Sequence, residues 1–288
     1  MKLAFTLFAL FAVALPCMAA SCTASLAPSA DAFVTSYYPG NNYGAAGGLS
    51  VSGSTAVNGQ GTQMGTLDTF IGFNLAATVS SFDSQFGNHA WTLTAATLRL
   101  TEQAAPNNPI FNRGVGRFET RWIASDTWTE GTGNPNNPSA TGITFQQKSA
   151  FLNSSTDASL GVFSNKGVND DITFALALPH AFIDDVRSGG QVSLFFTAVD
   201  SSVGFTFNAR ELTAPRLPPS LILTAAHIDG DVNLDCKVNI LDLIAVRNHL
   251  NEDVATGGNS RFDLNTDGKV NILDLIYVRS RLNTSCWQ

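Results

Sequence analysis

The last sixty residues contain one 20-residue unit written twice. The first copy runs from Asp231 to Leu250 and the second from Asp263 to Leu282, 32 residues later. Aligned without gaps, the copies are identical at 14 of 20 positions. Identity at this level between two neighbouring segments indicates a duplicated structural unit. The C-terminal region must therefore fold as two copies of one local structure.

Each copy opens with oxygen-bearing residues at the spacing of a 12-residue calcium loop. Such a loop supplies oxygens from positions 1, 3, 5, 7, 9 and 12 at about 2.3–2.6 Å, whereas magnesium demands tighter octahedral geometry. One Asp/Asn-rich turn could be a plain surface turn, but two in register, each followed by an apolar helical pattern, predict two bound calcium ions. The expected ligands are Asp231, Asn233, Asp235, the Lys237 carbonyl, Asn239 and Asp242, then Asp263, Asn265, Asp267, the Lys269 carbonyl, Asn271 and Asp274.

Paired units of the form D-x-N-x-D-x-K-V-N-x-x-D-L resemble the type I dockerin, the calcium-dependent module by which secreted polysaccharide-degrading components bind cohesin domains. The resemblance covers Asp229–Leu282. The closing ligand is Asp in both loops, where the general EF-hand has Glu, and dockerins also use Asp. The resemblance implies a small α-helical domain, here residues 227–288, with a cohesin of a scaffold or surface protein as its partner.

The same resemblance implies which residues meet the cohesin. By this resemblance, loop positions 10 and 11 and a basic position later in the helix correspond to the residues with which dockerins recognise cohesins. Because these positions are duplicated almost perfectly, either copy could present the same face. The alternative is that the apolar pairs pack between the two units. The residues concerned are Ile240, Leu241 and Arg247 in the first copy, and Ile272, Leu273 and Arg279 in the second.

Position 6 of each loop makes a sharp turn for which Gly is expected. The second loop has Gly268 there, but the first has Cys236. Cys286 lies just past the last helical segment, and a pseudo-twofold pair of units places the first loop near that end. We therefore predict a Cys236–Cys286 disulfide. The alternative, two free thiols, is uncommon in an oxidising compartment.

The N-terminal residues have the features of an export signal. Lys2 supplies the positive charge, Leu3–Leu15 an apolar stretch, and residues 17–20 a small-residue cleavage site. Residues 1–20 are thus expected to be a signal peptide, and the protein to be secreted, extracellular or attached to the cell surface. Cys22 follows a weak lipid-attachment pattern and could be lipidated. No second hydrophobic segment is long enough to span a bilayer.

The middle of the chain is expected to be mainly β. After a small, polar linker at residues 21–30, residues 31–226 hold short runs of alternating apolar and polar residues between Gly, Asn and Pro turns. This pattern favours an antiparallel β-sandwich. One helix is expected between Pro179 and Gly189. The runs predicted as strands are Ala32–Ser36, Leu49–Ser52, Thr69–Leu75, Ala95–Glu102, Val115–Trp122, Ile143–Phe145, Ile172–Leu178, Val192–Ala198, Val203–Asn208 and Ser220–Thr224.

Several short sequence segments of this domain resemble the DNRLRE (disaggregatase-related) family of jelly-roll modules, some of which bind acidic polysaccharides. Departures are Asn74, where the family usually has Asp, and Phe145, where it usually has Trp. The resemblance implies a jelly-roll fold and a carbohydrate ligand. The matching segments are Asp31–Val34, Asn42–Gly44, Phe70–Leu75, Ala95–Leu100, Trp128–Gly131, Gly142–Phe145, Glu211 and Pro215–Thr224.

Basic residues are scarce in this domain, which makes their positions informative. Arg99, Arg117 and Arg121 would suit a polyanionic sugar if they alternate onto one outer sheet face, although ordinary solvated strand faces are the alternative. A second candidate is a sugar-stacking platform of tryptophans, against which stands burial in the core. The tryptophans are Trp91, Trp122 and Trp128.

The composition limits the range of functions. A net charge of −7 argues against nucleic-acid binding. The histidines have no metal-ligand spacing, and no nucleophile elbow is present, so no catalytic residue is assigned. We interpret the chain as a secreted, non-catalytic polysaccharide-binding protein docked through a dockerin. The alternatives are a glycoside hydrolase or lyase that pairs two sandwich carboxylates, and a structural surface protein.

Overall fold

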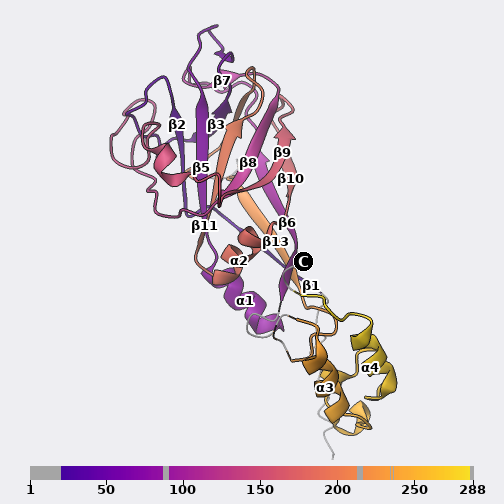
Figure 1. Ribbon diagram of the computed structural model, residues 1–288. Helices are drawn as coiled ribbons and strands as arrows, with labels where there is room; N and C mark the ends of the chain where they lie inside the picture. The colour runs from indigo at the N-terminus through magenta and orange to yellow at the C-terminus, as the bar shows by residue number, and fades with distance from the viewer. Residues whose placement is uncertain (1–20, 87–90, 213–216, 234, 236, 286–288) are drawn as a thin grey trace, which may run out of the picture.

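A computed structural model describes residues 21–86, 91–212, 217–233, 235 and 237–285. The predicted signal peptide, and both cysteines of the predicted disulfide, lie outside the described residues. Figure 1 shows a β-sandwich at one end of the molecule and a pair of helices at the other. No helix among the described residues is long and apolar enough to cross a membrane.

The sandwich consists of two antiparallel sheets. The four-stranded sheet has the order β1-β13-β6-β10, and the seven-stranded sheet runs β12-β3-β5-β11-β8-β9 with β2 also paired to β5. Strands β4 and β7 form a separate pair. The bounds are β1 Ser21–Leu26, β2 Ala30–Thr35, β3 Gly48–Ser52, β4 Val57–Asn58, β5 Leu67–Asn74, β6 Thr92–Thr101, β7 Asn112–Arg113, β8 Arg117–Ile123, β9 Ala158–Ser164, β10 Asp171–Leu176, β11 Gln191–Ala198, β12 Gly204–Asn208 and β13 Ser220–Ala226.

The two sheets enclose the main hydrophobic core. In β10, Ile172, Phe174 and Leu176 are buried while the residues between them are exposed, as period-two alternation predicts. β5 is instead buried on both faces: Ile71 lies in the main core, and Phe70 in a second cluster with Trp128 and Phe195. Two antiparallel sheets that enclose a shared apolar core confirm the predicted β-sandwich.

The linker predicted at residues 21–30 is wrong. Ser21–Leu26 forms β1, which pairs with β13 along its whole length, and Ala30 already belongs to β2. The error has a physical cause. The segment is small and polar because β1 is an edge strand with mostly exposed side chains, and only Leu26 is buried.

Two further differences concern residues 76–86 and 124–164. Helix α1 (Ala76–Phe86) and strand β9 were not expected, and Ile143–Phe145 is irregular backbone rather than a strand. This irregular segment continues into the 3-10 helix η1 (Lys148–Phe151) and contributes Ile143 to the outer cluster. The predicted helix is confirmed as α2 (His180–Ser188), with Pro179 at its N-cap and Gly189 left-handed at its C-cap.

The C-terminal region contains two short helices, α3 (Ile240–Asn248) and α4 (Ile272–Arg279). Each begins with a capping box, formed by Asn239 and Asp242 in α3 and by the equivalent pair in α4. Two 3-10 turns, η2 (Val254–Thr256) and η3 (Ser260–Phe262), connect them. The two copies share a small core of their own, which consists of Ile228, Val232, Val238, Val246, Phe262, Val270 and Val278.

A pseudo-twofold relation between the copies appears in the backbone pairing. Val238 in the first copy accepts a hydrogen bond from the N–H of Asn283, at 2.9 Å. Its counterpart Val270 accepts one from the N–H of Asn251, at 2.8 Å. Both asparagines have φ of 70°. Each loop therefore pairs with the chain that leaves the other helix, as the duplication predicted.

Candidate calcium loops and docking faces

The first loop is shaped by its own carboxylates. Asp242, fully buried, accepts hydrogen bonds from the N–H groups of Val232 (3.0 Å) and Asn239 (2.8 Å). Asp231 is also fully buried and accepts from the N–H of Asp235 at 3.2 Å. These bonds hold the loop closed around its own oxygens. Asp235 itself is exposed at the mouth of the loop.

Three of the predicted ligands in this loop meet at one point. Oxygens of Asp231, Asp235 and Asp242 lie within 4.8 Å of one another. Oxygens bound to one calcium ion at about 2.4 Å must lie within about 5 Å of each other, so this spacing fits a shared ion. Carboxylates gathered without a cation would repel one another.

The second loop repeats the hydrogen bonds of the first. Asp274 accepts from the N–H groups of Leu264 (2.7 Å) and Asn271 (2.8 Å), as Asp242 does at the equivalent positions. Asp263 accepts from Asp267 at 3.1 Å. Gly268, at position 6, has φ of +90°, the left-handed region that favours glycine. Since the closing Asp of each loop is also the third residue of a capping box, ligand position and helix start are set together.

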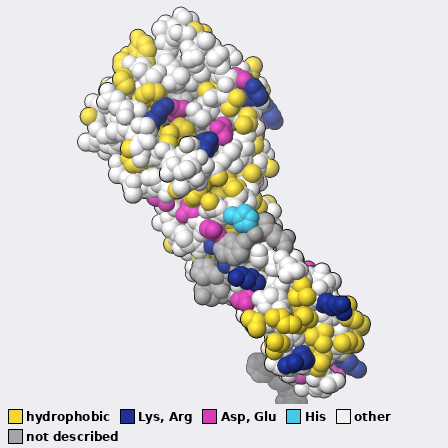
Figure 2. Space-filling view, in the orientation of Figure 1, with side chains coloured by type: hydrophobic (Ala, Val, Ile, Leu, Met, Phe, Trp, Pro, Cys, Tyr) yellow, Lys and Arg dark blue, Asp and Glu magenta, His cyan; other side chains and the backbone are white. Residues whose placement is uncertain are grey.

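The apolar pairs at the helix starts face solvent. Ile240 and Ile272 are each 62% exposed, and Leu241 and Leu273 are 53% and 51% exposed. These values argue against the alternative in which the pairs pack between the two units. Arg247 and Arg279 are exposed as well. Figure 2 shows hydrophobic and basic side chains together on the surface of the C-terminal region.

Two isoleucines that sequence reasoning passed over extend these faces. Ile244 is 37% exposed and Ile276 is 55% exposed. Each lies four residues after the first isoleucine of its helix, which places both on one side of the helix. That spacing was the available signal. Exposed aliphatic side chains in this number are unusual for a surface that no partner covers.

The loop geometry and the exposed faces agree with the comparison against known families. Residues 229–283 match the family model of the dockerin type I domain. Type I dockerin domains bind calcium, and the cluster of Asp231, Asp235 and Asp242 is consistent with this. Dockerins join their chains to cohesins, so the match supports a cohesin partner and an extracellular assembly of the cellulosome type.

The other comparisons add little. No curated protein matches the chain. One solved structure, titled "Structure of the Macrobrachium rosenbergii Nodavirus", aligns with 10% identity and a TM-score of 0.25. The alignment covers 79% of this chain and 59% of that one. A likeness this weak carries no argument about fold or function. The DNRLRE resemblance of residues 31–226 stays a prediction.

The sandwich does not place the three predicted arginines on one face. Arg99 lies on β6 of the four-stranded sheet, whereas Arg117 and Arg121 lie on β8 of the other sheet. Arg117 pairs with Asp200 at 2.8 Å. Arg121 contacts Glu119 at 3.6 Å. The polyanion site expected from alternation is therefore wrong, because strands close in sequence order belong to opposite sheets.

The tryptophan platform is wrong as well. Trp91, Trp122 and Trp128 are buried, and each indole N–H donates inside the protein. The acceptors are Asp83 for Trp91 (2.8 Å), Asp185 for Trp122 (2.6 Å) and Ser193 for Trp128 (2.9 Å). Satisfied indoles in a core leave no aromatic face for a sugar. These three residues stabilise the sandwich instead.

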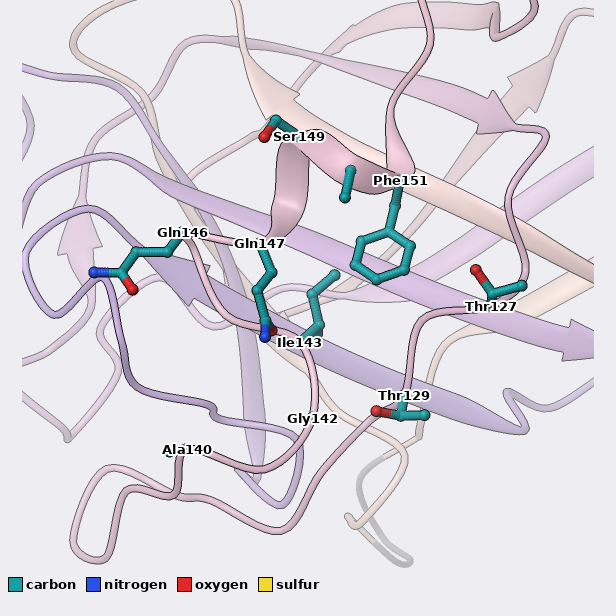
Figure 3. Close-up of a pocket in the computed structure, with 10 residues that line it drawn as sticks. Thr127, Thr129, Ala140, Gly142, Ile143, Gln146, Gln147, Ser149 and Phe151 are labelled. Carbon is teal, nitrogen blue, oxygen red and sulfur yellow. The ribbon is translucent and has the colours of Figure 1, made fainter.

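Several hollows on the described part of the sandwich are large enough for a sugar unit. The one in Figure 3, about 440 Å³, is lined by Thr127, Thr129, Gln146, Gln147 and Phe151 among others. Another, about 500 Å³, contains Tyr37 and Tyr38, which are 49% and 44% exposed. This hollow offers the aromatic surface that the tryptophans do not.

Proposed function

We propose that the dockerin region attaches this chain to a cohesin through the exposed apolar faces of α3 and α4. The observation that carries the proposal is the exposure of Ile240, Leu241, Ile272 and Leu273, which follow directly after the candidate calcium loops. A cohesin that buries one such cluster removes apolar surface from water at about 25 cal/mol per Å². The exposed arginines at the rim, Arg247 and Arg279, would add charge complementarity.

The duplication supports two equivalent binding faces. The two apolar pairs are identical in sequence and have nearly the same exposure. The pseudo-twofold pairing of the loops places the copies in equivalent surroundings. A half-turn of the dockerin region would therefore offer a cohesin the same chemistry twice. Each face would bind on its own.

Paired substitutions test the two-face proposal. Ile240→Asp with Leu241→Asp should leave cohesin affinity within about twofold, because the second face substitutes. Adding Ile272→Asp and Leu273→Asp should reduce affinity by more than about a thousandfold. Isothermal titration against candidate cohesins measures both, with Val115→Asp, an exposed valine on the sandwich, as the control.

Circular dichroism in calcium must accompany that titration. The fourfold variant should keep its calcium-dependent helical signal. Loss of cohesin binding from the first double variant alone would contradict two faces. Loss of folding in the fourfold variant would show that the pairs are structural.

A second function, polysaccharide binding by the sandwich, is favoured by the hollow at Tyr37 and Tyr38. The two rings lie 4.7 Å apart between centroids, edge to face. The described lining carries no charged side chain, and the amides of Asn41 and Gln60 line the same hollow. An exposed aromatic ring stacks on the apolar face of a pyranose, and amides bind its hydroxyls. This chemistry suits a neutral polysaccharide.

Affinity electrophoresis in gels that contain xylan, mannan or mixed-linkage glucan tests this function. Retardation in one of them should fall at least about tenfold for the Tyr37→Ala and Tyr38→Ala double variant. Val168→Ala, an exposed valine elsewhere on the sandwich, should bind like the unmodified chain. Equal migration in every gel would favour a structural surface protein. Release of sugar products from any of these polymers would identify a hydrolase or lyase.

A further inference from the structure

A cluster of three carboxylates lies in the sandwich, far along the chain from the calcium loops. Asp31 belongs to β2, Glu130 to the segment after β8, and Glu211 to the segment after β12. Oxygens of the three lie within 4.8 Å of one another. Asp31 is only 1% exposed, and the side chains of Glu130 and Glu211 are 17% and 28% exposed. Three chain segments thus bring acidic groups to one partly buried point.

One buried oxygen of this cluster lacks a hydrogen bond among the described residues. Asp31 Oδ2 accepts from the backbone N–H of Arg210 at 2.8 Å. Asp31 Oδ1 is buried and has no hydrogen-bond partner among the described residues. A buried carboxylate oxygen without a hydrogen bond destabilises the fold, because its lost hydration is not replaced. A ligand that supplies positive charge would remove this cost.

The neighbouring cation does not balance the charge. Arg210 pairs with both oxygens of Glu130 and contacts Glu211 at 3.3 Å. Three carboxylates and one guanidinium leave two negative charges, which a divalent cation would neutralise. Like-charged groups held together in this way are what a bound cation stabilises.

The cluster is held in place by packing. Asn42 donates to the backbone carbonyl of Glu130 at 2.6 Å and to that of Ile143 at 2.8 Å. A Cβ added at Gly44 would lie 1.9 Å from the Glu130 carbonyl oxygen, so the two segments touch through their backbones. Asp31 itself is fixed by the pairing of β2 with β5. A site with so little room to rearrange is pre-organised for its ligand.

We propose that Asp31, Glu130 and Glu211 bind a divalent cation, and that calcium is this cation. Oxygen-only donors select hard cations, and calcium accepts irregular arrangements of carboxylates better than magnesium does. The ion links the start of the sandwich to the segments after β8 and β12. It is independent of the dockerin region, and so of cohesin binding.

Calcium counting on the full chain tests this site. A variant with Asp235→Ala and Asp267→Ala, which disables the dockerin loops, should retain one calcium ion per chain after dialysis and metal analysis. Adding Glu211→Gln or Asp31→Asn should abolish that ion. Asp200→Asn, an acidic residue on the same domain that pairs with Arg117, is the matched control and should keep it. No retained calcium in the dockerin-disabled variant would overturn the proposal.

Thermal unfolding supplies a second readout in the same background. Calcium should raise the melting temperature of the sandwich relative to chelator, and Glu211→Gln should remove the difference. Glu211 is partly exposed, so this variant stays informative if Asp31→Asn does not fold. The site would also be overturned if Glu211→Gln raised the melting temperature above that of the background variant by the same amount in calcium and in chelator. That result would mean that the three carboxylates only repel one another and bind no ion.

Discussion

At the scale of single residues, the two closing aspartates and Asp185 show how surroundings set the role of a carboxylate. Asp242 and Asp274 accept backbone N–H groups in a helix cap and a loop. Asp185 accepts the Trp122 indole N–H instead, and burial raises its pKa to about 6. These bonds fix Asp242 and Asp274 as candidate calcium ligands. Burial instead destabilises the ionised form of Asp185.

Asp185 gives a prediction about pH. The pKa of Asp185 in the folded protein, about 6, lies above its ordinary value of 3.8. Protonation of Asp185 therefore contributes fully to the free energy of unfolding below pH 3.8, and this contribution is lost as pH rises through 6. Asp185→Asn keeps an acceptor for Trp122 and removes the charge. At pH 7.5 it should stabilise the sandwich by roughly 1–2 kcal/mol, discounted for partial exposure.

Urea denaturation at pH 7.5 and pH 4 checks this prediction. The gain should be present at the higher pH and nearly absent at the lower one. Asp184→Asn, the neighbouring residue on α2, is the control. A gain of equal size at both pH values would contradict the assignment to Asp185 ionisation.

The predicted disulfide belongs to the same scale. Cys236 and Cys286 lie outside the described residues, but the residues next to them, Lys237 and Ser285, form an antiparallel bridge. Chain connectivity then favours the proximity that a disulfide needs. A loop of about 50 residues closed in this way would stabilise the region by roughly 4 kcal/mol.

Peptide mapping without reduction should recover Cys236 linked to Cys286. Alkylation of both thiols before reduction would reject the link. Cys22, which forms no disulfide with a described residue, should be modified in the same experiment unless it is lipidated.

At the scale of elements, α3 and α4 are short helices that expose much of their apolar surface. They have nine and eight residues, shorter than helices that are stable alone in water. Their apolar residues are shared between a small core, at Val246 and Val278, and solvent, at Ile240 and Ile272. Capping boxes and metal ligands must therefore supply much of their stability.

Chelation should accordingly unfold this region. Without calcium, the oxygens of each loop repel one another and the helix caps weaken, so metal binding is part of the folding free energy. Far-ultraviolet circular dichroism of the full chain should lose helical signal in chelator and regain it with excess calcium. Asp235→Ala and Asp267→Ala should each remove one site. An unchanged spectrum and melting point in chelator would refute the coupling.

At the scale of the whole molecule, two separate hydrophobic cores predict two unfolding units. Phe118 lies in the sandwich core and Val246 in the dockerin core, and the clusters share no residue. Phe118→Ala should therefore lower the free energy of unfolding of the sandwich alone, by about 3–5 kcal/mol. Val246→Ala should lower the free energy of unfolding of the dockerin region alone, by roughly 2 kcal/mol.

Differential scanning calorimetry in calcium resolves the two transitions. A shift of both transitions by either variant would show that the two parts unfold as one unit. Ala substitution at the exposed Val162 is the control and should move neither transition.

The features that could be predicted from the sequence are those whose causes lie within about a dozen residues. The helices that follow the two candidate calcium loops depend on local spacing, and duplication repeated the signal. Alternation in strands such as β10, and the Pro and Gly that bound α2, are local in the same way. The β-sandwich followed from summing such patterns.

Features that depend on distant partners could not be predicted in this way. Residues 21–26 become a strand only because β13, about two hundred residues later, offers an edge to pair with. Arg99 and Arg117 are separated because β6 and β8 join different sheets. Asp31, Glu130 and Glu211 meet only when strand β2 and the segments after β8 and β12 fold together. Spacing along a strand indicates which side a residue faces, but long-range pairing determines what lies opposite it.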